Sequence, residues 1–167
     1  FVPADGSALE QRTGNYYDGY ATAQVHNPIS TDRLNLRVEK TENSASLGKY
    51  YNGCTVAIVQ KGNDGWSRVR IGNLEGYMKN QFLDFNAPKD QQIEMLPKVT
   101  IQNSNGQGVN LRKQASTHVN AVALYPNGTQ VQVLGIAGEW CHVLIDGEIG
   151  FMMTQYLVPR LSFESTR

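Results

Sequence analysis

The sequence lacks the features that mark several large classes of protein. Two of its 167 residues are cysteine, Cys54 and Cys141, which is too few for a disulfide framework. Charged residues make up only 18%, with fifteen Lys and Arg against fifteen Asp and Glu. We therefore expect no nucleic-acid partner, because such proteins usually carry a basic excess. No apolar run approaches the roughly 18 residues of a membrane span, so none is expected in this chain.

A repeated pattern organises the chain. The run Leu34-Asn35-Leu36-Arg37 matches Val109-Asn110-Leu111-Arg112 at a shift of 75 residues, from Arg37 to Arg112. After a one-residue contraction the match continues to the end of both copies. The further matched pairs are Tyr50 with Tyr125, Asn52-Gly53 with Asn127-Gly128, Val56 with Val131, Trp66 with Trp140, Val69 with Val143, Gly76-Tyr77-Met78 with Gly150-Phe151-Met152, and Leu83 with Leu157.

Each copy has the pattern of short β-strands. Residues 67–71 and 129–133 alternate between polar and apolar side chains, which is typical of strands with one buried face. Asn-Gly and Asp-Gly steps follow at short intervals and favour tight hairpin turns. No long amphipathic helix is evident. The sequence therefore predicts an all-β protein built from two tandem small barrels, since barrel closure removes exposed sheet edges.

The boundaries of these units follow from the repeat and from local composition. We expect one barrel over residues 23–86 and the other over 97–160. A polar stretch with proline near each end predicts a linker over 87–96. Residues 1–22 are rich in Gly, Asp and Tyr without periodicity and form an N-terminal extension, and 161–167 form a C-terminal tail.

The repeated residues resemble the bacterial SH3 (SH3b) domain family in both copies. The resemblance is carried by the Leu-Asn-Leu-Arg and Val-Asn-Leu-Arg elements, the Asn-Gly turns, the two tryptophans with a valine three residues later, and the Gly-aromatic-Met steps. It implies two SH3-like barrels. One departure is evident, because residues 38–40 and 113–115 replace the Ser-Gly-Pro that most members carry after the arginine. The long loop beside the family's ligand groove is therefore altered.

The cysteines and histidines do not predict catalysis or metal binding. Cys141 and His142 are adjacent, but neighbouring residues of a strand point to opposite faces. Cys141 shares its face with Val143, and Cys54 shares its face with Val56, so both thiols are expected to be buried core residues. His26, His118 and His142 lie in separate elements without ligand spacing. We expect no metal, no cofactor and no enzymatic activity.

Aromatic side chains are the candidate ligand contacts. Equivalent sets occur in the two copies, and such rings stack on sugars or pack against peptide side chains in binding grooves. The alternative is that they close the ends of the barrels. The asparagine and arginine of each repeated run are expected to tie the long loop to the barrel. The candidate ligand-binding residues are Tyr50, Trp66, Tyr77, Tyr125, Trp140 and Phe151.

The two copies differ in charge. Residues 34–83 hold seven Lys and Arg against four Asp and Glu, whereas residues 109–157 hold two against three. An anionic wall polymer would therefore favour the first copy.

The family resemblance implies a secreted or envelope-associated bacterial protein, with no signal peptide visible in this chain. It predicts a non-catalytic module that binds cell-wall peptidoglycan or another wall component. One alternative is a protein-interaction or regulatory module that holds an envelope protein, which the altered loop favours. Another is a cysteine-dependent wall enzyme that uses Cys54 or Cys141.

Overall fold

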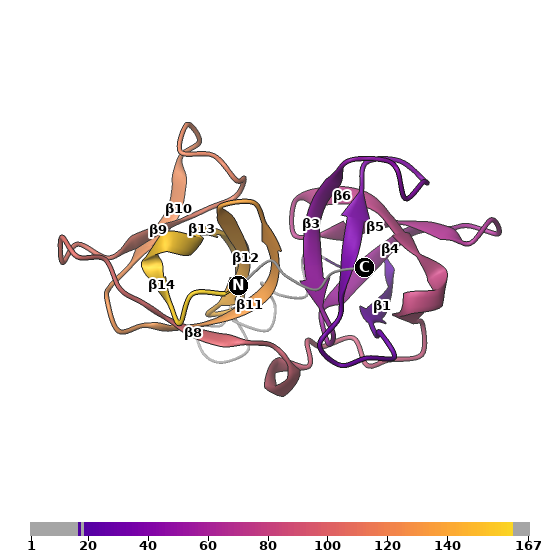
Figure 1. The fold of residues 1–167 in the computed structure, drawn as a ribbon, viewed down its shortest axis with the longest axis horizontal. Helices are drawn as coiled ribbons and strands as arrows, with labels where there is room; N and C mark the ends of the chain where they lie inside the picture. The colour runs from indigo at the N-terminus through magenta and orange to yellow at the C-terminus, as the bar shows by residue number, and fades with distance from the viewer. Residues whose placement is uncertain (1–16, 18, 162–167) are drawn as a thin grey trace.

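The computed structural model describes residues 17 and 19–161, and these form an all-β protein of two similar halves (Figure 1). The N-terminal half contains β1 (Ala21–Val25), β2 (Arg33–Arg37), β3 (Ser46–Tyr51), β4 (Thr55–Lys61), β5 (Trp66–Ile71), β6 (Leu74–Lys79), the 3-10 turn η1 (Asn80–Phe82) and β7 (Leu83–Asp84). The C-terminal half contains β8 (Lys98–Ile101), β9 (Val109–Arg112), β10 (Ala121–Tyr125), β11 (Gln130–Ala137), β12 (Trp140–Ile145), β13 (Glu148–Met153), η3 (Thr154–Tyr156) and β14 (Leu157–Val158). The turn η2 (Ile93–Met95) lies between them.

Both halves have the same strand order. Hydrogen-bonded neighbours run β7-β1-β4-β5-β6-β2-β3 in the first and β14-β8-β11-β12-β13-β9-β10 in the second, with every pair antiparallel. This order is the one that an internal repeat predicts, and the all-β class is confirmed. Among the residues that the structure describes, strand pairing does not close either half into a ring. Instead β3 pairs with β11, which joins the described strands into one continuous sheet.

The predicted hairpins and strand faces are present. Residues 66–71 show the alternating burial expected of a strand with one core face. The Asn-Gly turns place Gly53 and Gly128 at φ of 93° and 90°, a region that glycine adopts without steric cost. Within the described residues, no helix is long and apolar enough to cross a membrane.

The segment over 87–96 is tied to the N-terminal half. Gln24 Nε2 on β1 donates to the carbonyl oxygens of Pro88 at 3.1 Å and Asp90 at 2.7 Å. The Gln91 side-chain oxygen accepts from the Thr55 backbone N–H at 2.8 Å, and the Leu96 side chain is buried. The segment therefore has the composition of a linker but packs as part of the first half.

Most of the N-terminal extension, over 1–22, lies outside the described residues, and so does most of the tail over 161–167. Tyr17 is described. Its ring is buried in the first core, and its hydroxyl donates to the Thr55 carbonyl oxygen at 3.0 Å. At this point the extension contacts the first half.

The hydrophobic core is continuous between the halves. The buried cluster of the first half includes three residues of the second half, Leu134, Leu144 and Ile149. The cluster of the second half in turn contacts Tyr51 of β3. The β3 strand and the β11 and β12 strands face each other at the centre of the molecule (Figure 1). The two copies thus pack directly against each other through this core.

Candidate ligand-binding pocket

Trp66 is held at the start of β5 by a fixed turn. The Asp64 carboxylate accepts from the Trp66 backbone N–H at 3.2 Å. Asn80 spans the base of the turn, where its Nδ2 donates to the Gly62 carbonyl oxygen at 3.1 Å and its Oδ1 accepts from the Ser67 hydroxyl at 2.6 Å. These bonds hold the indole, which is half-buried, beside the loop that follows β2.

The loop after β2 is closed by the arginine of the repeated run. Arg37 Nη1 donates to the Ser44 carbonyl oxygen at 2.9 Å, and Asn35 Oδ1 accepts from the Ser46 hydroxyl at 2.7 Å. The second copy has the equivalent hydrogen bond, which Arg112 Nη1 donates to the Val119 carbonyl oxygen at 2.6 Å. These bonds confirm that the arginines tie the loops to the sheet.

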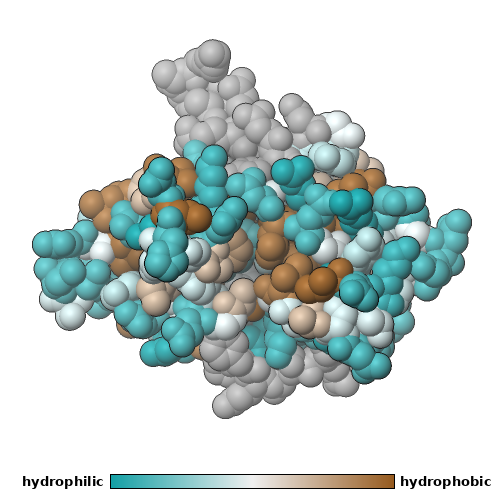
Figure 2. All heavy atoms as spheres, turned by 90° about the horizontal axis from the view of Figure 1, so that it is seen from above, coloured by the Kyte–Doolittle hydropathy of each residue, from teal (hydrophilic) through white to brown (hydrophobic). Residues whose placement is uncertain are grey.

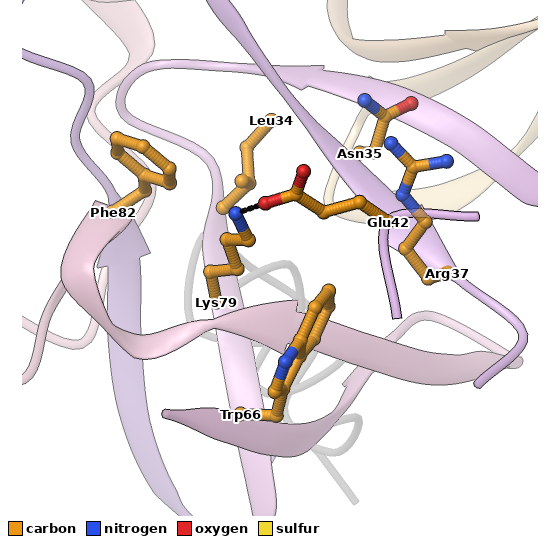
Figure 3. Close-up of a pocket in the computed structure, with 7 residues that line it drawn as sticks. All are labelled: Leu34, Asn35, Arg37, Glu42, Trp66, Lys79 and Phe82. Atoms are coloured by element: carbon orange, nitrogen blue, oxygen red, sulfur yellow. Dashed lines mark ion pairs between the residues drawn. The ribbon is translucent and has the colours of Figure 1, made fainter. Parts of the chain in front are cut away.

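A pocket of about 300 Å³ lies between Trp66 and this loop (Figure 3). The Glu42 carboxylate and the Lys79 ammonium form an ion pair across it. Lys79 Nζ also lies 5.9 Å from the centre of the Trp66 ring. The pocket therefore combines an aromatic wall with the anionic Glu42 and the cationic Arg37 and Lys79. Its lining residues are Leu34, Asn35, Arg37, Glu42, Trp66, Lys79 and Phe82.

A more open hollow of about 520 Å³ adjoins the pocket and shares Glu42, Trp66 and Lys79 with it. Lys40 Nζ lies 3.3 Å from the Asp64 carboxylate and 5.6 Å from the centre of the Tyr77 ring. Hydrogen bonds from the Trp66 N–H and from Lys40 lower the pKa of Asp64. Both charges are largely exposed, so a ligand can replace the contacts between them.

The six candidate aromatic residues are not brought together. Trp66 borders the pocket and half-buried Tyr77 lies beside Lys40 of the adjoining hollow, whereas Trp140 and Tyr125 are half-buried in the second half. Tyr50 and Phe151 are buried between the halves, with exposed fractions of 0% and 3%, and offer no surface to a ligand. Sequence reasoning missed two pocket residues beside Trp66, the acidic Glu42 and the basic Lys79. The sequence gives only a weak signal for Glu42 and Lys79, since isolated surface charges are common.

Tyr50 and Phe151 enclose His142, which the sequence places on the strand face opposite Cys141 and without metal-ligand spacing. A hydrogen bond of 2.7 Å joins Tyr50 Oη to His142 Nδ1. The His142 ring stacks on Phe151 with centroids 4.0 Å apart and planes inclined by 11°. Burial lowers the pKa of His142 to about 3 and raises that of Tyr50. The histidine is therefore a neutral member of the contact between halves.

Glycines allow the halves to approach closely at this contact. Gly135 of β11 lies opposite Tyr50 of β3, and a Cβ at Gly135 would be 2.5 Å from Cδ1 of the Tyr50 ring. Gly72, at φ 58°, lies in the β5–β6 turn, where an added Cβ would be 2.8 Å from Ile149 Cγ2. Side chains at either position would push the halves apart.

The cysteines occupy the core positions that the strand pattern predicts. Cys54 and Cys141 are free thiols with exposed fractions of 0% and 1%. Burial raises the pKa of Cys54 and raises that of Cys141 to about 12. Neither thiol is therefore ionised near neutral pH, as a nucleophile must be. Within residues 17 and 19–161, no three His, Cys, Asp or Glu side chains are grouped to hold a metal ion.

The comparisons with known proteins agree with the internal repeat. The family described as bacterial SH3 domain matches residues 32–84 and 107–158, which together are more than half of the chain. A Bacillus subtilis (strain 168) protein named "Putative N-acetylmuramoyl-L-alanine amidase YrvJ" is 22% identical over 127 residues. That match covers 74% of this chain and 24% of the relative.

Solved structures of NlpC2 and NlpC1 from Trichomonas vaginalis are also similar. They cover 84% and 85% of this chain at 17% and 18% identity, with TM-scores of 0.40 and 0.38. This chain covers 48% and 46% of theirs. It thus spans about half the length of those proteins and about a quarter of the Bacillus relative.

Proposed function

The chain belongs to the bacterial SH3 domain family, and on this premise we propose that it is a non-catalytic module that binds bacterial cell-wall peptidoglycan. The site is the pocket of the N-terminal half beside Trp66. The name of the Bacillus relative describes an amidase for the N-acetylmuramoyl-L-alanine linkage, which joins the glycan of peptidoglycan to its peptide. We infer a secreted or envelope-associated location for the same reason.

The observation that carries the proposal is the composition of the pocket. Peptidoglycan offers sugar rings, amide groups, carboxylates and free amines within one repeating unit. The Trp66 face suits a sugar ring or an aliphatic peptide side chain. Glu42 and Lys79 supply partners for an ammonium group and for a carboxylate, and their mutual ion pair stays close to solvent. A ligand that carries both an ammonium group and a carboxylate replaces the single ion pair of Glu42 with Lys79 by two ion pairs, one to each side chain.

The state of the cysteines supports a non-catalytic role for this chain. Both thiols lie in the cores, and burial raises the pKa of each. His142, the adjacent base on β12, is engaged by the Tyr50 hydroxyl on the opposite face of the strand. A protein partner is the second candidate function, and the exposed apolar side chains of Val122 and Leu124 favour it.

The test is co-sedimentation of the full chain with purified sacculi from several bacteria, at low and at high salt. We expect binding that survives salt, and Trp66→Ala lowers the affinity at least about tenfold, as loss of an aromatic anchor does. Trp140→Ala is the matched control and leaves binding unchanged.

Lys79→Met is a milder pocket variant, because the second copy carries Met153 at the equivalent position. We expect it to weaken binding while circular dichroism remains that of the wild type. No binding to any sacculus, or equal losses for the two tryptophan variants, contradicts the proposal.

A further inference from the structure

Two ion pairs of opposite polarity join the loop after β2 to the sheet. Lys40 of the loop pairs with Asp64 of the β4–β5 turn, and Glu42 of the loop pairs with Lys79 at the end of β6. The first pair lies in the open hollow and the second in the pocket beside Trp66. A group that enters between the loop and the sheet therefore meets both a cation and an anion.

The second copy keeps this loop but not its charges. In both copies the arginine of the repeated run donates to the carbonyl oxygen seven residues later, so the two loops are closed in the same way. Three charged residues around the pocket have neutral equivalents in the second copy, namely Ala115 for Lys40, Thr117 for Glu42 and Met153 for Lys79. Closure of the loop therefore does not require these charges, which points to a role for them in ligand selection.

The size and the walls of the pocket limit what it can hold. Its volume of about 300 Å³ is small for a ligand site, so it fits one end of a side chain rather than a whole repeating unit of a polymer. The Leu34, Trp66 and Phe82 side chains line the pocket together with the ion pair of Glu42 with Lys79 (Figure 3). Such walls suit a short methylene chain that ends in charged groups.

The charges of the pocket favour a ligand that carries a carboxylate. Arg37 and Lys79 line it as cations, and Glu42 lines it as an anion. A ligand with an ammonium group and no carboxylate is attracted by Glu42 but repelled by both cations. A ligand with both charges pairs with Glu42 and Lys79 at once. Separating these two side chains costs little, because they are 65% and 27% exposed.

The surface around the pocket also suits a charged ligand. Seen from above, hydrophilic residues cover most of the N-terminal half, on the right (Figure 2). Residues 34–83 carry seven Lys and Arg against four Asp and Glu. The half that holds the pocket therefore attracts a ligand with an excess of carboxylates.

We propose that the pocket binds the free end of a diamino dicarboxylic acid side chain, where an ammonium group and a carboxylate share one carbon, as in peptides that contain 2,6-diaminopimelate. The carboxylate pairs with Lys79, the ammonium group pairs with Glu42, and the methylene chain lies against Trp66. This inference rests on the proposed function and names the group of peptidoglycan that the pocket selects. A lysine side chain lacks the carboxylate, and a peptide cross-link converts the ammonium group into an amide, so both bind more weakly.

The test is isothermal titration calorimetry of the full chain with three synthetic tripeptides that differ only in the third residue. That residue is meso-diaminopimelate, L-lysine, or meso-diaminopimelate with its side-chain amine acetylated as in a cross-link. We expect the first peptide to bind at least about tenfold more tightly than either of the others, which is the effect of one hydrogen bond to a charged group. Equal affinity for the first peptide and either of the others, or no binding of any peptide, overturns the proposal.

Two pocket variants separate recognition of each charge from a general loosening of the loop. Lys79→Met should largely remove the preference over the lysine peptide and keep the preference over the acetylated peptide. Glu42→Gln should do the reverse. The matched control is Lys61→Met, the same change at an exposed lysine outside the pocket, which should keep both preferences. A pocket variant that lowers all three affinities by the same factor overturns the proposal.

Sacculi distinguish this inference from the proposed function. Sacculi whose peptides contain diaminopimelate should retain the chain more strongly than sacculi whose peptides contain lysine. Equal retention by both kinds, lost in Trp66→Ala, overturns this inference but agrees with the proposed function. Retention by neither kind contradicts both.

Discussion

Two faces of the molecule are built from equivalent positions but have opposite character. One is the outward face of β5 and β6 in the first copy, and the other is the outward face of β12 and β13 in the second. In the first copy this face carries Trp66, Arg68, Arg70, Glu75, Tyr77 and Lys79; in the second it carries Trp140, His142, Leu144, Ile149, Phe151 and Met153. Every charged residue of the first face is replaced by a neutral or apolar one. The first face meets solvent and borders the pocket, whereas the centre of the second is buried against the first copy.

This difference shows which parts of a duplicated fold stay alike and which parts diverge. The core residues of the two copies are similar, because both copies must bury the same inner face. Their outer faces diverge, since one holds the copies together and the other meets solvent. Variants at equivalent positions test this difference, because they should change the stability of the chain by very different amounts in the two copies.

The largest effect is expected at Gly135. A valine there places its side chain in the space of the Tyr50 ring and separates β11 from β3. We expect Gly135→Val to lower the free energy of unfolding by about 3 kcal/mol, as overpacking a close contact does. The equivalent Gln60→Val is exposed and should change it by less than about 0.5 kcal/mol. Urea denaturation measures both, and equal losses would show that the contact does not stabilise the chain.

The next effect is expected at His142. Replacing it by alanine opens a cavity against Phe151 and leaves the buried Tyr50 hydroxyl without its partner. We expect His142→Ala to cost about 2 to 3 kcal/mol. The equivalent Arg68→Ala removes only an exposed ion pair with Glu75 and should cost less than about 1 kcal/mol. Similar values for the two variants in thermal or urea unfolding would contradict the assignment of His142 to the contact.

A smaller effect is expected from pH. The pKa of His142 is about 3 in the folded chain against an ordinary value of 6.5, so the unfolded chain binds more protons between these values. Stability is then complete above about pH 6.5 and falls as the pH is lowered toward 3, with a limiting slope of about 1.4 kcal/mol per unit. At pH 5.5 we expect a loss of about 1 kcal/mol.

His142→Gln is the control for this pH dependence, because glutamine does not titrate. The difference between its stability and that of the wild type should shrink as the pH falls from 7 to 5.5. A difference that stays constant over this range would show that His142 is not buried as a neutral ring.

Much of the fold can be predicted from the sequence, because repeated strands and turns depend on local pattern. The 75-residue shift, the Asn-Gly turns and the core positions of both cysteines follow from alternation and spacing. Part of the pocket also follows, since Trp66 and the loop-closing arginine belong to the repeated pattern. Glu42 and Lys79 do not, because their pairing depends on how the loop after β2 folds back over β6.

The contact between the copies is the part that pattern reasoning missed. Tyr50 and Phe151 were expected among the ligand contacts because equivalent aromatic residues occur in both copies. Their burial depends on the packing of one copy against the other, which no local pattern describes. A signal did exist, because Arg70 and Glu75 of the first copy are replaced by Leu144 and Ile149 on the outer face of the second.

The most direct test of this account uses the two tryptophans, one of which lies in each half. Trp66→Phe leaves Trp140 to report on the C-terminal half, and Trp140→Phe leaves Trp66 to report on the N-terminal half. We predict that in each variant the urea unfolding curve from tryptophan fluorescence coincides with the curve from circular dichroism, because the halves share one core. Two transitions separated in denaturant concentration would show that the halves unfold independently, and would contradict the account.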